Sequence, residues 1–435
     1  MVESLIDKKK GISRKIGNAK RAGESIEELL VQMKQVTQQI KTLEQDRVVD
    51  TIKEKEACQS DGVSSDIVVD RSSPQLFAGQ KGGQGDIPLS DIVINELEGD
   101  SLSSLWNAYV EKTPGSSLYH RWEFREQIKL SFGHETIYLA ALNEAGEICG
   151  VLPAVLLSSR LFGRFIISMP FFNYGSVLAD SQGIEGKLID ALIGLAKSKM
   201  AEHVELRSVC SREGMLLKTN KVAMILPLPT DSNVLWQDIG AKVRSQIKKA
   251  NRFDLRMEFG KSELLDDFYQ VFATNMRDLG TPVYSRTFFQ NLITCELQEQ
   301  FHIGVVYKDG SPVSCCFLMG HKDMLEIPWA STLSSFNHMN ANMFMYWEIL
   351  KKAISEKYDF FDFGRSSKDA GTFRFKKQWG AKPEQLYWHY WLSEGGALPE
   401  LNPNNPKYRL IISVWQRMPV WLTKLIGPRL VKFLP

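Results

Sequence analysis

The side chains best suited to chemistry gather in the stretch from residue 359 to residue 380. Aromatic and acidic residues alternate at its start, which is typical of one strand, and Gly364 is expected to end that strand. Arg365 and Ser366 follow on a predicted polar turn, where their donors could hold a phosphate or a carboxylate. We interpret Asp362, on the strand itself, as an inward-facing carboxylate that orients its neighbours.

The next segment interleaves cationic and aromatic side chains and includes Phe375, Lys376 and Lys377. This composition suits a surface that binds an anion through its cations and stacks its rings on a flat group. An edge strand with a solvated face is the alternative interpretation.

Upstream of both groups, a strand-like run ends near Thr332 and is followed by a polar loop. An apolar-periodic helix is predicted over 342–354, with Asn342 at its start. Asparagine is a good N-cap, and helix N-termini bind phosphates through their free N–H groups. A strand, a loop, a helix start and a second strand carrying Arg365 and Ser366 therefore predict a cleft for an acyl donor.

Together these segments carry a family resemblance. The motifs are, in order, WAS at 329–331, Asn342, YW at 346–347, FDFGRS at 361–366 and FKKQWG at 375–380. They resemble the FemAB-like branch of the GNAT acyltransferase superfamily, and within it the FemAB-type proteins found with exosortase (PEP-CTERM) and exopolysaccharide loci. The resemblance covers residues from about 92 to 430.

This resemblance implies N-acyl transfer to an amine of a cell-wall or exopolysaccharide precursor, with no tightly bound cofactor. The acyl donor would be a co-substrate, either aminoacyl-tRNA or acyl-CoA. The family's F-K pair implies that Lys376 meets a phosphate or oxyanion and that Phe375 meets adenine, with Lys377 beside them. Pyrophosphate loops of the usual GNAT kind are absent between Ser331 and Asn342, which argues mildly against acyl-CoA.

An amine that attacks an acyl carbonyl must be oriented, must lose a proton and must form a stabilised oxyanion. The sequence has no GxSxG, no cysteine with a nearby histidine motif and no P-loop, so positioning is favoured over covalent catalysis. We place Tyr119, Arg121 and Tyr174 on the acceptor side. Tyr174 belongs to an aromatic loop at 170–175, which is either exposed and able to stack on a sugar or base, or packed as a turn.

The body of the chain contains an internal repeat. Two Y-x-R-x-x-F motifs, at 119–124 and 284–289, each precede a strand, a tight turn, another strand, an amphipathic helix and a strand ending in Arg-Ser. Two matched units imply tandem, similarly folded α+β domains. We predict GNAT-like domains over 91–228 and 229–393.

Length and composition fit a globular protein of two domains with appendages. The chain has 435 residues, of which 43% are hydrophobic and 24% charged, and its net charge of +2 gives no overall attraction to nucleic acid. The six cysteines and seven histidines show no metal-ligand spacing, so no metal is expected. Neither a signal peptide nor a transmembrane-length apolar run is evident. We expect a cytoplasmic protein, peripheral at the inner membrane face.

Residues 1–47 are predicted to form an antiparallel helical hairpin, because apolar residues recur at coiled-coil spacing in its second helix. The first helix is basic, and the hairpin is similar to the coiled-coil arm of seryl-tRNA synthetases. That likeness implies contact with tRNA, and a protein-docking or spacer role is the alternative. Residues 48–90 are rich in Ser, Gly, Asp and Gln and are predicted to be a flexible linker.

The last segment, 394–435, is predicted to be an amphipathic tail in which aromatic, aliphatic and cationic residues alternate. That composition suits the membrane interface, and it suits packing against the body equally well.

Two other functions compete with FemAB-type transfer. One is a non-catalytic scaffold or binding module in polysaccharide assembly, in which the hairpin recruits partners. The other is an acyl-CoA-dependent acetyltransferase that acts on an amino sugar. A panel of acyl donors would separate the three.

Overall fold

The computed structural model describes residues 74–77, 88–159, 162–368, 370–396, 398 and 406–434, and the scattered positions 11, 15, 27–28, 31–32 and 35. The predicted hairpin at 1–47 and most of the predicted linker at 48–90 lie outside the described residues, so both stay predictions. Residues 71–435 form one compact unit.

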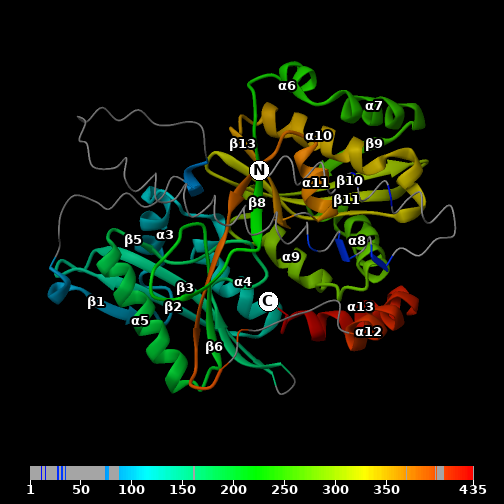
Figure 1. Cartoon of the computed structure of the whole chain (residues 1–435). Coiled ribbons are helices and arrows are strands. Elements are labelled where there is room, and N and C mark those ends of the chain that lie inside the picture. Colours follow the sequence, from blue (N-terminus) through cyan, green and yellow to red (C-terminus); the bar gives the residue numbers. More distant parts are fainter. Residues whose placement is uncertain are drawn as a thin grey trace. The chain divides into compact units, whose positions relative to one another are not determined.

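The first repeat builds one sheet, in the strand order β1-β2-β3-β4-β6-β15-β7, with β5 paired to β3 (Figure 1). The strands are β1 (Val93–Glu96), β2 (Glu135–Leu142), β3 (Ile148–Ser159), β4 (Gly163–Ile167), β5 (Leu178–Ala179), β6 (His203–Ser208), β7 (Leu216–Lys218) and β15 (Tyr387–Leu392). The helices are α3 (Ser103–Lys112), α4 (Glu123–Phe132) and α5 (Gln182–Ser198), and the 3-10 turns are η1 (Gln75–Phe77), η2 (Leu89–Asp91) and η3 (Leu118–His120). Residues 148–157 of β3 are all buried, because both faces of this sheet are covered.

The second repeat builds a sheet in the order β14-β8-β13-β12-β11-β10-β9. Its strands are β8 (Lys221–Pro227), β9 (Arg256–Gly260), β10 (Phe301–Lys308), β11 (Ser311–His321), β12 (Met324–Thr332), β13 (Phe360–Ser367) and β14 (Lys382–Gln385). Its helices are α6 (Ser232–Asp238), α7 (Ala241–Ala250), α8 (Leu265–Leu279), α9 (Arg286–Thr294), α10 (Ala341–Ser355) and α11 (Gly371–Lys377). The 3-10 turns are η4 (Asn251–Phe253), η5 (Ser262–Leu264), η6 (Gln298–Gln300) and η7 (Ser334–Met339).

The order of elements confirms the tandem α+β organisation expected from the repeat. After the first Y-x-R-x-x-F motif come α4, β2, β3, α5 and β6, and after the second come α9, β10, β11, α10 and β13. Both α5 and α9 begin at a serine N-cap, Ser181 and Ser285, whose hydroxyl accepts a backbone N–H. Both β6 and β13 carry the predicted Arg-Ser pair.

Each sheet also takes a strand from the far side of the predicted domain boundary between residues 228 and 229. Strand β8 precedes that boundary but pairs with β13 and β14 of the second sheet. Strand β15 follows the second sheet in sequence but pairs with β6 and β7 of the first. Because these exchanged strands are hydrogen-bonded on both sides, the two repeats are joined by their backbones.

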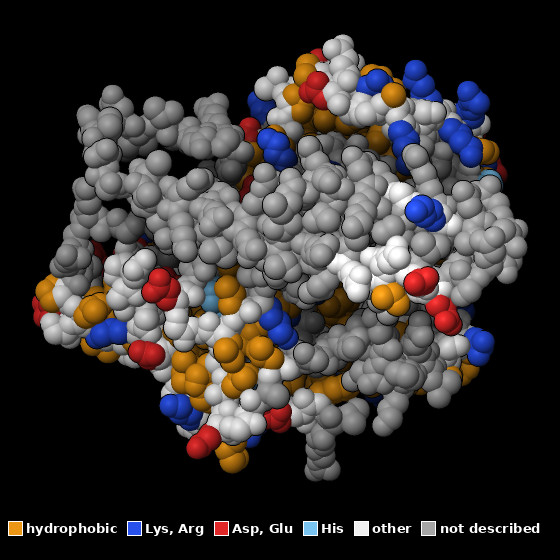
Figure 2. Space-filling view, in the orientation of Figure 1, with side chains coloured by type: hydrophobic (Ala, Val, Ile, Leu, Met, Phe, Trp, Pro, Cys, Tyr) orange, Lys and Arg blue, Asp and Glu red, His pale blue; other side chains and the backbone are white. Residues whose placement is uncertain are grey.

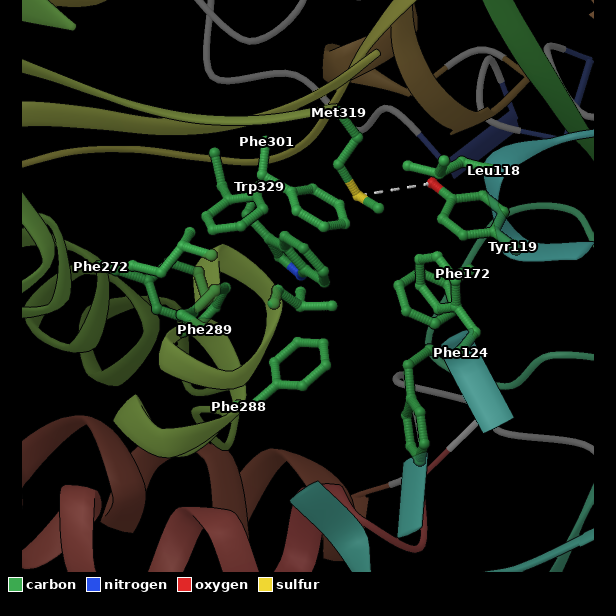
Figure 3. Close-up of a cluster of buried hydrophobic side chains, with 14 of the residues drawn as sticks. Leu118, Tyr119, Phe124, Phe172, Phe272, Phe288, Phe289, Phe301, Met319 and Trp329 are labelled. Carbon is green, nitrogen blue, oxygen red and sulfur yellow. Dashed lines mark hydrogen bonds between the residues drawn. The ribbon is translucent and has the colours of Figure 1, made fainter. Parts of the chain in front are cut away.

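A shared hydrophobic core lies between the repeats (Figure 3). Phe172 of the first repeat lies with ring centroids 6.2 Å from Trp329 and 6.5 Å from Phe288, both of the second repeat. Tyr119 stacks on Phe172 at 4.3 Å, and its hydroxyl oxygen lies 4.0 Å from the sulfur of Met319. Aromatic residues bury large areas, so this core contributes strongly to holding the repeats together.

Helix α7 has one buried face and one basic face. Val243, Ile247 and Ala250 are buried, while Lys248 and Lys249 are exposed. In Figure 2 blue Lys and Arg side chains stand over α7 at the upper right of the molecule. Because its apolar residues recur every three or four positions, this helix has one face in the core and one face in solvent.

The tail forms two helices, α12 (Pro406–Arg417) and α13 (Val420–Val431), which pack against α8. Trp415, Thr423 and Val431 are buried, so of the two alternatives left open for the tail, this face packs against the body. None of the helices in the described residues combines the length and the apolarity that crossing a bilayer requires.

Candidate functional site

The candidate site is centred on the point where β12 and β13 separate. The two strands pair in parallel from Met324–Phe360 to Glu326–Asp362, and the described pairing ends there. Glu326 and Asp362, at 5% and 0% exposure, are therefore neighbouring carboxylates at the last pair before the strands diverge.

Both carboxylates are held by side chains of the first repeat. The Tyr174 hydroxyl donates to Asp362 Oδ2, and the Tyr119 hydroxyl donates to Glu326 Oε2. Asn173 Nδ2 donates to Glu326 Oε1 at 2.7 Å. Of the two tyrosines predicted on the acceptor side, Tyr174 contacts the predicted Asp362 and Tyr119 contacts Glu326, so the site is built from both repeats.

The pKa values of both carboxyl groups are raised. Burial raises the pKa of Glu326 to about 8, and the nearby Asp362 charge adds to that rise against the hydrogen bonds from Tyr119 and Asn173. Burial also raises the pKa of Asp362, although the Tyr174 hydroxyl and the Gly364 N–H favour its charged form. Two carboxylates this close do not both ionise readily, so the pair retains a proton near neutral pH.

A β-bulge at Gly364 shapes the second strand. Gly364 has φ +76°, and the pairing of β13 with β8 shifts between Asp362 and Arg365. Its N–H donates to Asp362 Oδ1 at 2.7 Å. Gly364 was expected to end the strand, but β13 continues to Ser367, because a glycine at positive φ can insert an extra residue without stopping the pairing.

Lys376 reaches this bulge from helix α11. Its Nζ donates to the carbonyls of Gly364 and Arg365, both at 2.9 Å. Burial lowers the pKa of Lys376 to about 8, and the charge of Asp362 opposes that fall. The segment is a short helix rather than the edge strand considered from the sequence, and it places Lys376 inward while Lys377 is exposed.

Arg365 and Arg207, the two arginines of the Arg-Ser pairs, stack on the same indole. Their guanidinium carbons lie 5.3 and 4.8 Å from the ring of Trp388, on the exchanged strand β15. Burial, together with a smaller effect of the nearby Arg207 charge, lowers the pKa of Arg365 to about 10. The Arg365 Nη1 has no hydrogen-bond partner among the described residues.

Ser366 is 3% exposed, and its hydroxyl also lacks a partner within the described part of the chain. Consecutive side chains of a strand point to opposite faces of the sheet, so Arg365 and Ser366 offer their unpaired polar atoms to different surroundings. Their binding of an anionic carrier stays a prediction.

A cavity of about 210 Å³ lies where β12 ends and α10 begins. The lining residues are Asn275, Ala330, Ser331, Thr332, Asn342, Met345, Tyr346 and Phe375. The predicted donor residues Asn342 and Phe375 therefore line one cavity. Asn342 is not the N-cap that the sequence suggested, since α10 begins at Ala341 with Asn340 in the cap position.

A larger cavity, of about 330 Å³, lies in the first repeat. Tyr174, His120, Arg207 and the start of α5 at Gln182 are among its lining residues. The loop around Tyr174 is packed rather than exposed, because Phe171, Phe172 and Tyr174 are each 7% exposed or less. Tyr174 thus connects this cavity with Asp362.

Arg121 lies apart from these groups. It forms ion pairs with Glu123 at 2.9 Å and with Glu111 at 3.6 Å, and it does not line either cavity. Sequence reasoning missed Glu326 and Asn173. A single acid within the apolar run of β12 was the available signal for Glu326.

No group of three or more His, Cys, Asp or Glu side chains arranged to hold a metal occurs within the described ranges.

Comparison with known proteins identifies the fold of the second repeat. Residues 239–377 match the family described as acetyltransferase (GNAT) domain. This segment has the GNAT acetyltransferase fold. It contains the cavity at the start of α10 together with Glu326, Asp362, Arg365 and Lys376. A search of curated proteins finds no match to the sequence.

Solved structures extend the likeness to both repeats. The crystal structure of FemX is 15% identical, covers 74% of this chain and 100% of its own, and has a TM-score of 0.55. The C-terminal domain of a putative lysylphosphatidylglycerol synthetase from Agrobacterium fabrum is 12% identical over 66% of this chain and 90% of its own, with a TM-score of 0.47. A tandem GNAT protein from the clavulanic acid pathway is 10% identical over 71% of this chain and 100% of its own, at 0.46. The likeness to FemX shows a shared fold.

Proposed function

We propose that this protein is an N-acyltransferase of the FemAB/GNAT type. The observation that carries the proposal is the cavity between the end of β12 and the start of α10, which lies inside the segment with the GNAT fold. The N–H groups at the start of a long helix favour an anionic carrier, and Phe375 and Tyr346 offer rings beside it. The acyl donor would bind in this cavity.

The buried charges supply a route for the proton. In the reaction the amine nitrogen bonds to the acyl carbon, the bond from that carbon to the donor's oxygen or sulfur breaks with its electron pair, and the amine loses a proton. Asp362 accepts a hydrogen bond from the hydroxyl of Tyr174, and Tyr174 lines the larger cavity. An amine in that cavity could pass its proton through Tyr174 to Asp362, while Lys376 balances the charge.

The acceptor would then occupy the first repeat's cavity. Arg207 and His120 give it polar walls, and Tyr174 gives it an aromatic one. These features suit an amino sugar or a peptide amine on a cell-wall or exopolysaccharide precursor, in keeping with the motif resemblance to exosortase-associated FemAB-type proteins. The donor would be aminoacyl-tRNA, bound with the help of the basic hairpin, or acyl-CoA.

One observation favours a second candidate function. The ammonium group of Lys376 donates two hydrogen bonds to backbone carbonyls. Neither Lys376 nor Arg365 lines the cavity of about 210 Å³ or the cavity of about 330 Å³. A non-catalytic scaffold in polysaccharide assembly would keep this packed cluster for stability alone.

A donor panel separates the two candidates. Acetyl-CoA, longer acyl-CoAs and charged tRNAs would be mixed with amino sugars and peptide amines, and the acylated products detected by mass spectrometry. We expect transfer from one donor class, and at least ~10-fold less with Ala330→Trp, which fills the donor cavity. Val234→Trp, at a site 46% exposed on α6, is the matched control. Neither turnover nor binding of any donor would favour the scaffold.

A further inference from the structure

Helix α13 presents two contrasting faces. Thr423, Gly427 and Val431, spaced by four, are buried against the body. Trp421 and Leu425, also spaced by four, are 67% and 56% exposed. Helical periodicity therefore gives one face to the protein core and leaves a large aromatic and an aliphatic side chain in solvent.

The neighbouring helix α12 adds to this apolar exposure. Ile411 and Val414, three residues apart, are 60% and 47% exposed. Four large apolar side chains are thus exposed on the two tail helices, whereas a single exposed one would be ordinary on a protein surface.

The body holds both helices in place. Arg277 Nη1 donates to the carbonyl of Met418 at 3.1 Å, and Gln416 Nε2 donates to the carbonyl of Asp278 at 2.9 Å. At the far end, a ring nitrogen of His134 lies 2.6 Å from the carbonyl of Lys432. The exposed face is therefore preformed, and binding to a partner needs little ordering of the chain.

The charge of this segment is strongly one-sided. Between residues 406 and 434 the sequence contains no Asp or Glu, and six basic residues, Lys407, Arg409, Arg417, Lys424, Arg429 and Lys432. Arg417 and Arg429 are exposed and form no ion pair with any residue that the structure describes. Asp278, the acid that contacts α12 through its carbonyl, is neutralised by Arg277 at 2.6 Å.

We propose that α12 and α13 dock this protein on the surface of an anionic lipid bilayer. Trp421 and Leu425 would enter the boundary between headgroups and acyl chains, while Arg417 and Arg429 would contact lipid phosphates. Interfacial helices combine an apolar stripe with Lys and Arg in this way. Docking adds to the proposed acyl transfer and does not depend on it, because its contacts lie on the tail and not in either cavity.

The same charges disfavour a second copy of the chain as the occupant. A two-fold dimer places one patch against its own copy, so this surface would bring two sets of unpaired cations together. Like charges facing each other across an interface oppose association. An anionic surface removes that repulsion.

The test is co-sedimentation of the full chain with vesicles of phosphatidylcholine alone and of phosphatidylcholine with phosphatidylglycerol. We expect binding to the anionic vesicles that falls as NaCl rises from 50 to 500 mM, and little binding to neutral ones, since salt screens exposed charges. Trp421→Glu with Leu425→Glu should weaken binding at least ~10-fold, and Arg417→Glu with Arg429→Glu should do the same at low salt.

Val234→Glu is the matched control, because it puts one acid on an exposed apolar site of α6, far from α13 in Figure 1. Circular dichroism and thermal unfolding check that every variant folds. Equal binding of wild type and tail variants would overturn the proposal, as would equal binding to neutral and anionic vesicles. A wild-type dimer that the Trp421 and Leu425 variant converts to a monomer would instead assign this face to self-association and overturn it.

Discussion

The two repeats place the same parallel strand pair in different chemical surroundings. In the first repeat β4 and β6 last pair at Ile167–Glu205, and in the second β12 and β13 last pair at Glu326–Asp362. Glu205 forms a buried ion pair with Arg207 at 2.8 Å and accepts the Tyr390 hydroxyl at 2.8 Å. Its charge is therefore matched within its own strand.

In the second repeat the corresponding Asp362 forms no such ion pair with the arginine of its own strand among the described residues. Ile167 is replaced by Glu326, so two carboxylates meet, and the Gly364 bulge lies between Asp362 and Arg365. Arg365 stacks on Trp388 instead of pairing with Asp362, and Lys376 approaches from α11. The comparison indicates that the acid of the first strand pair is held in an ion pair, while the second strand pair holds two carboxyl groups whose pKa values are raised by burial and which can exchange protons.

Removing the charge of Glu205, which forms the buried ion pair with Arg207, should have the largest effect on stability. Glu205→Gln leaves the Arg207 guanidinium buried without its counter-charge, which should cost about 3–5 kcal/mol of unfolding free energy. Asp362→Asn should cost less than half of that, because the pKa of Asp362 is already raised and an amide relieves the repulsion from Glu326. Urea unfolding of both variants measures the difference, and an equal loss would break the comparison between the strand pairs.

Removing the cation of the second repeat should mainly affect turnover. Lys376→Ala should lower kcat/KM at least ~100-fold if the ammonium group stabilises charge in the transition state. Steady-state assays with the donor identified by the panel would measure this loss. Lys382→Ala, at an exposed lysine on β14, is the control and should stay near wild type. Retained activity in Lys376→Ala would remove this lysine from the mechanism.

The carboxylate pair should make stability depend on pH. The pKa of Glu326 rises from 4.5 to about 8 on folding, so its stabilising contribution is complete below pH 4.5 and is lost as pH rises through about 8. Glu326→Gln should therefore gain about 4 kcal/mol relative to wild type between pH 5 and pH 8.5. Thermal unfolding at several pH values measures that gain. A difference that does not change with pH would mean that Glu326 is already ionised.

The β-bulge at Gly364, which the described strand β6 of the first repeat lacks, can be tested by adding one methyl group. Gly364→Ala should cost about 1–2 kcal/mol, because φ +76° is strained for alanine. Gly371→Ala, where the added carbon meets no atom within 4 Å, should be neutral. Differential scanning calorimetry compares the two, and a neutral Gly364→Ala would show that the bulge tolerates a side chain.

The sequence predicts the tandem organisation well because its signals are local. The strand-like run expected to end near Thr332 ends there, and the helix expected over 342–354 runs from 341 to 355. Periodicity and tight turns determine such elements from a few neighbouring residues. The exchange of β8 and β15 between sheets has no local signal, since it depends on pairing across the whole chain.

The site itself is predicted in part. Asp362, Tyr119, Tyr174 and Lys376 do converge, but Tyr174 and Asp362 are 188 residues apart, and their contact cannot be derived from spacing. The sequence predicts a strand end at Gly364 because glycine is common both at strand ends and at bulges, and the residue type does not tell the two apart. Lys376 was expected to face an external anion, but packing turns it toward backbone carbonyls.

The most direct measurement compares turnover of Asp362→Asn and Glu205→Gln under conditions where both variants are folded. If the second repeat's strand pair carries the chemistry, Asp362→Asn should lose at least ~100-fold in kcat, and Glu205→Gln should stay within ~10-fold of wild type. Equal turnover of the two variants, or a greater loss in Glu205→Gln, would contradict the assignment of the reaction to Asp362 and its neighbours.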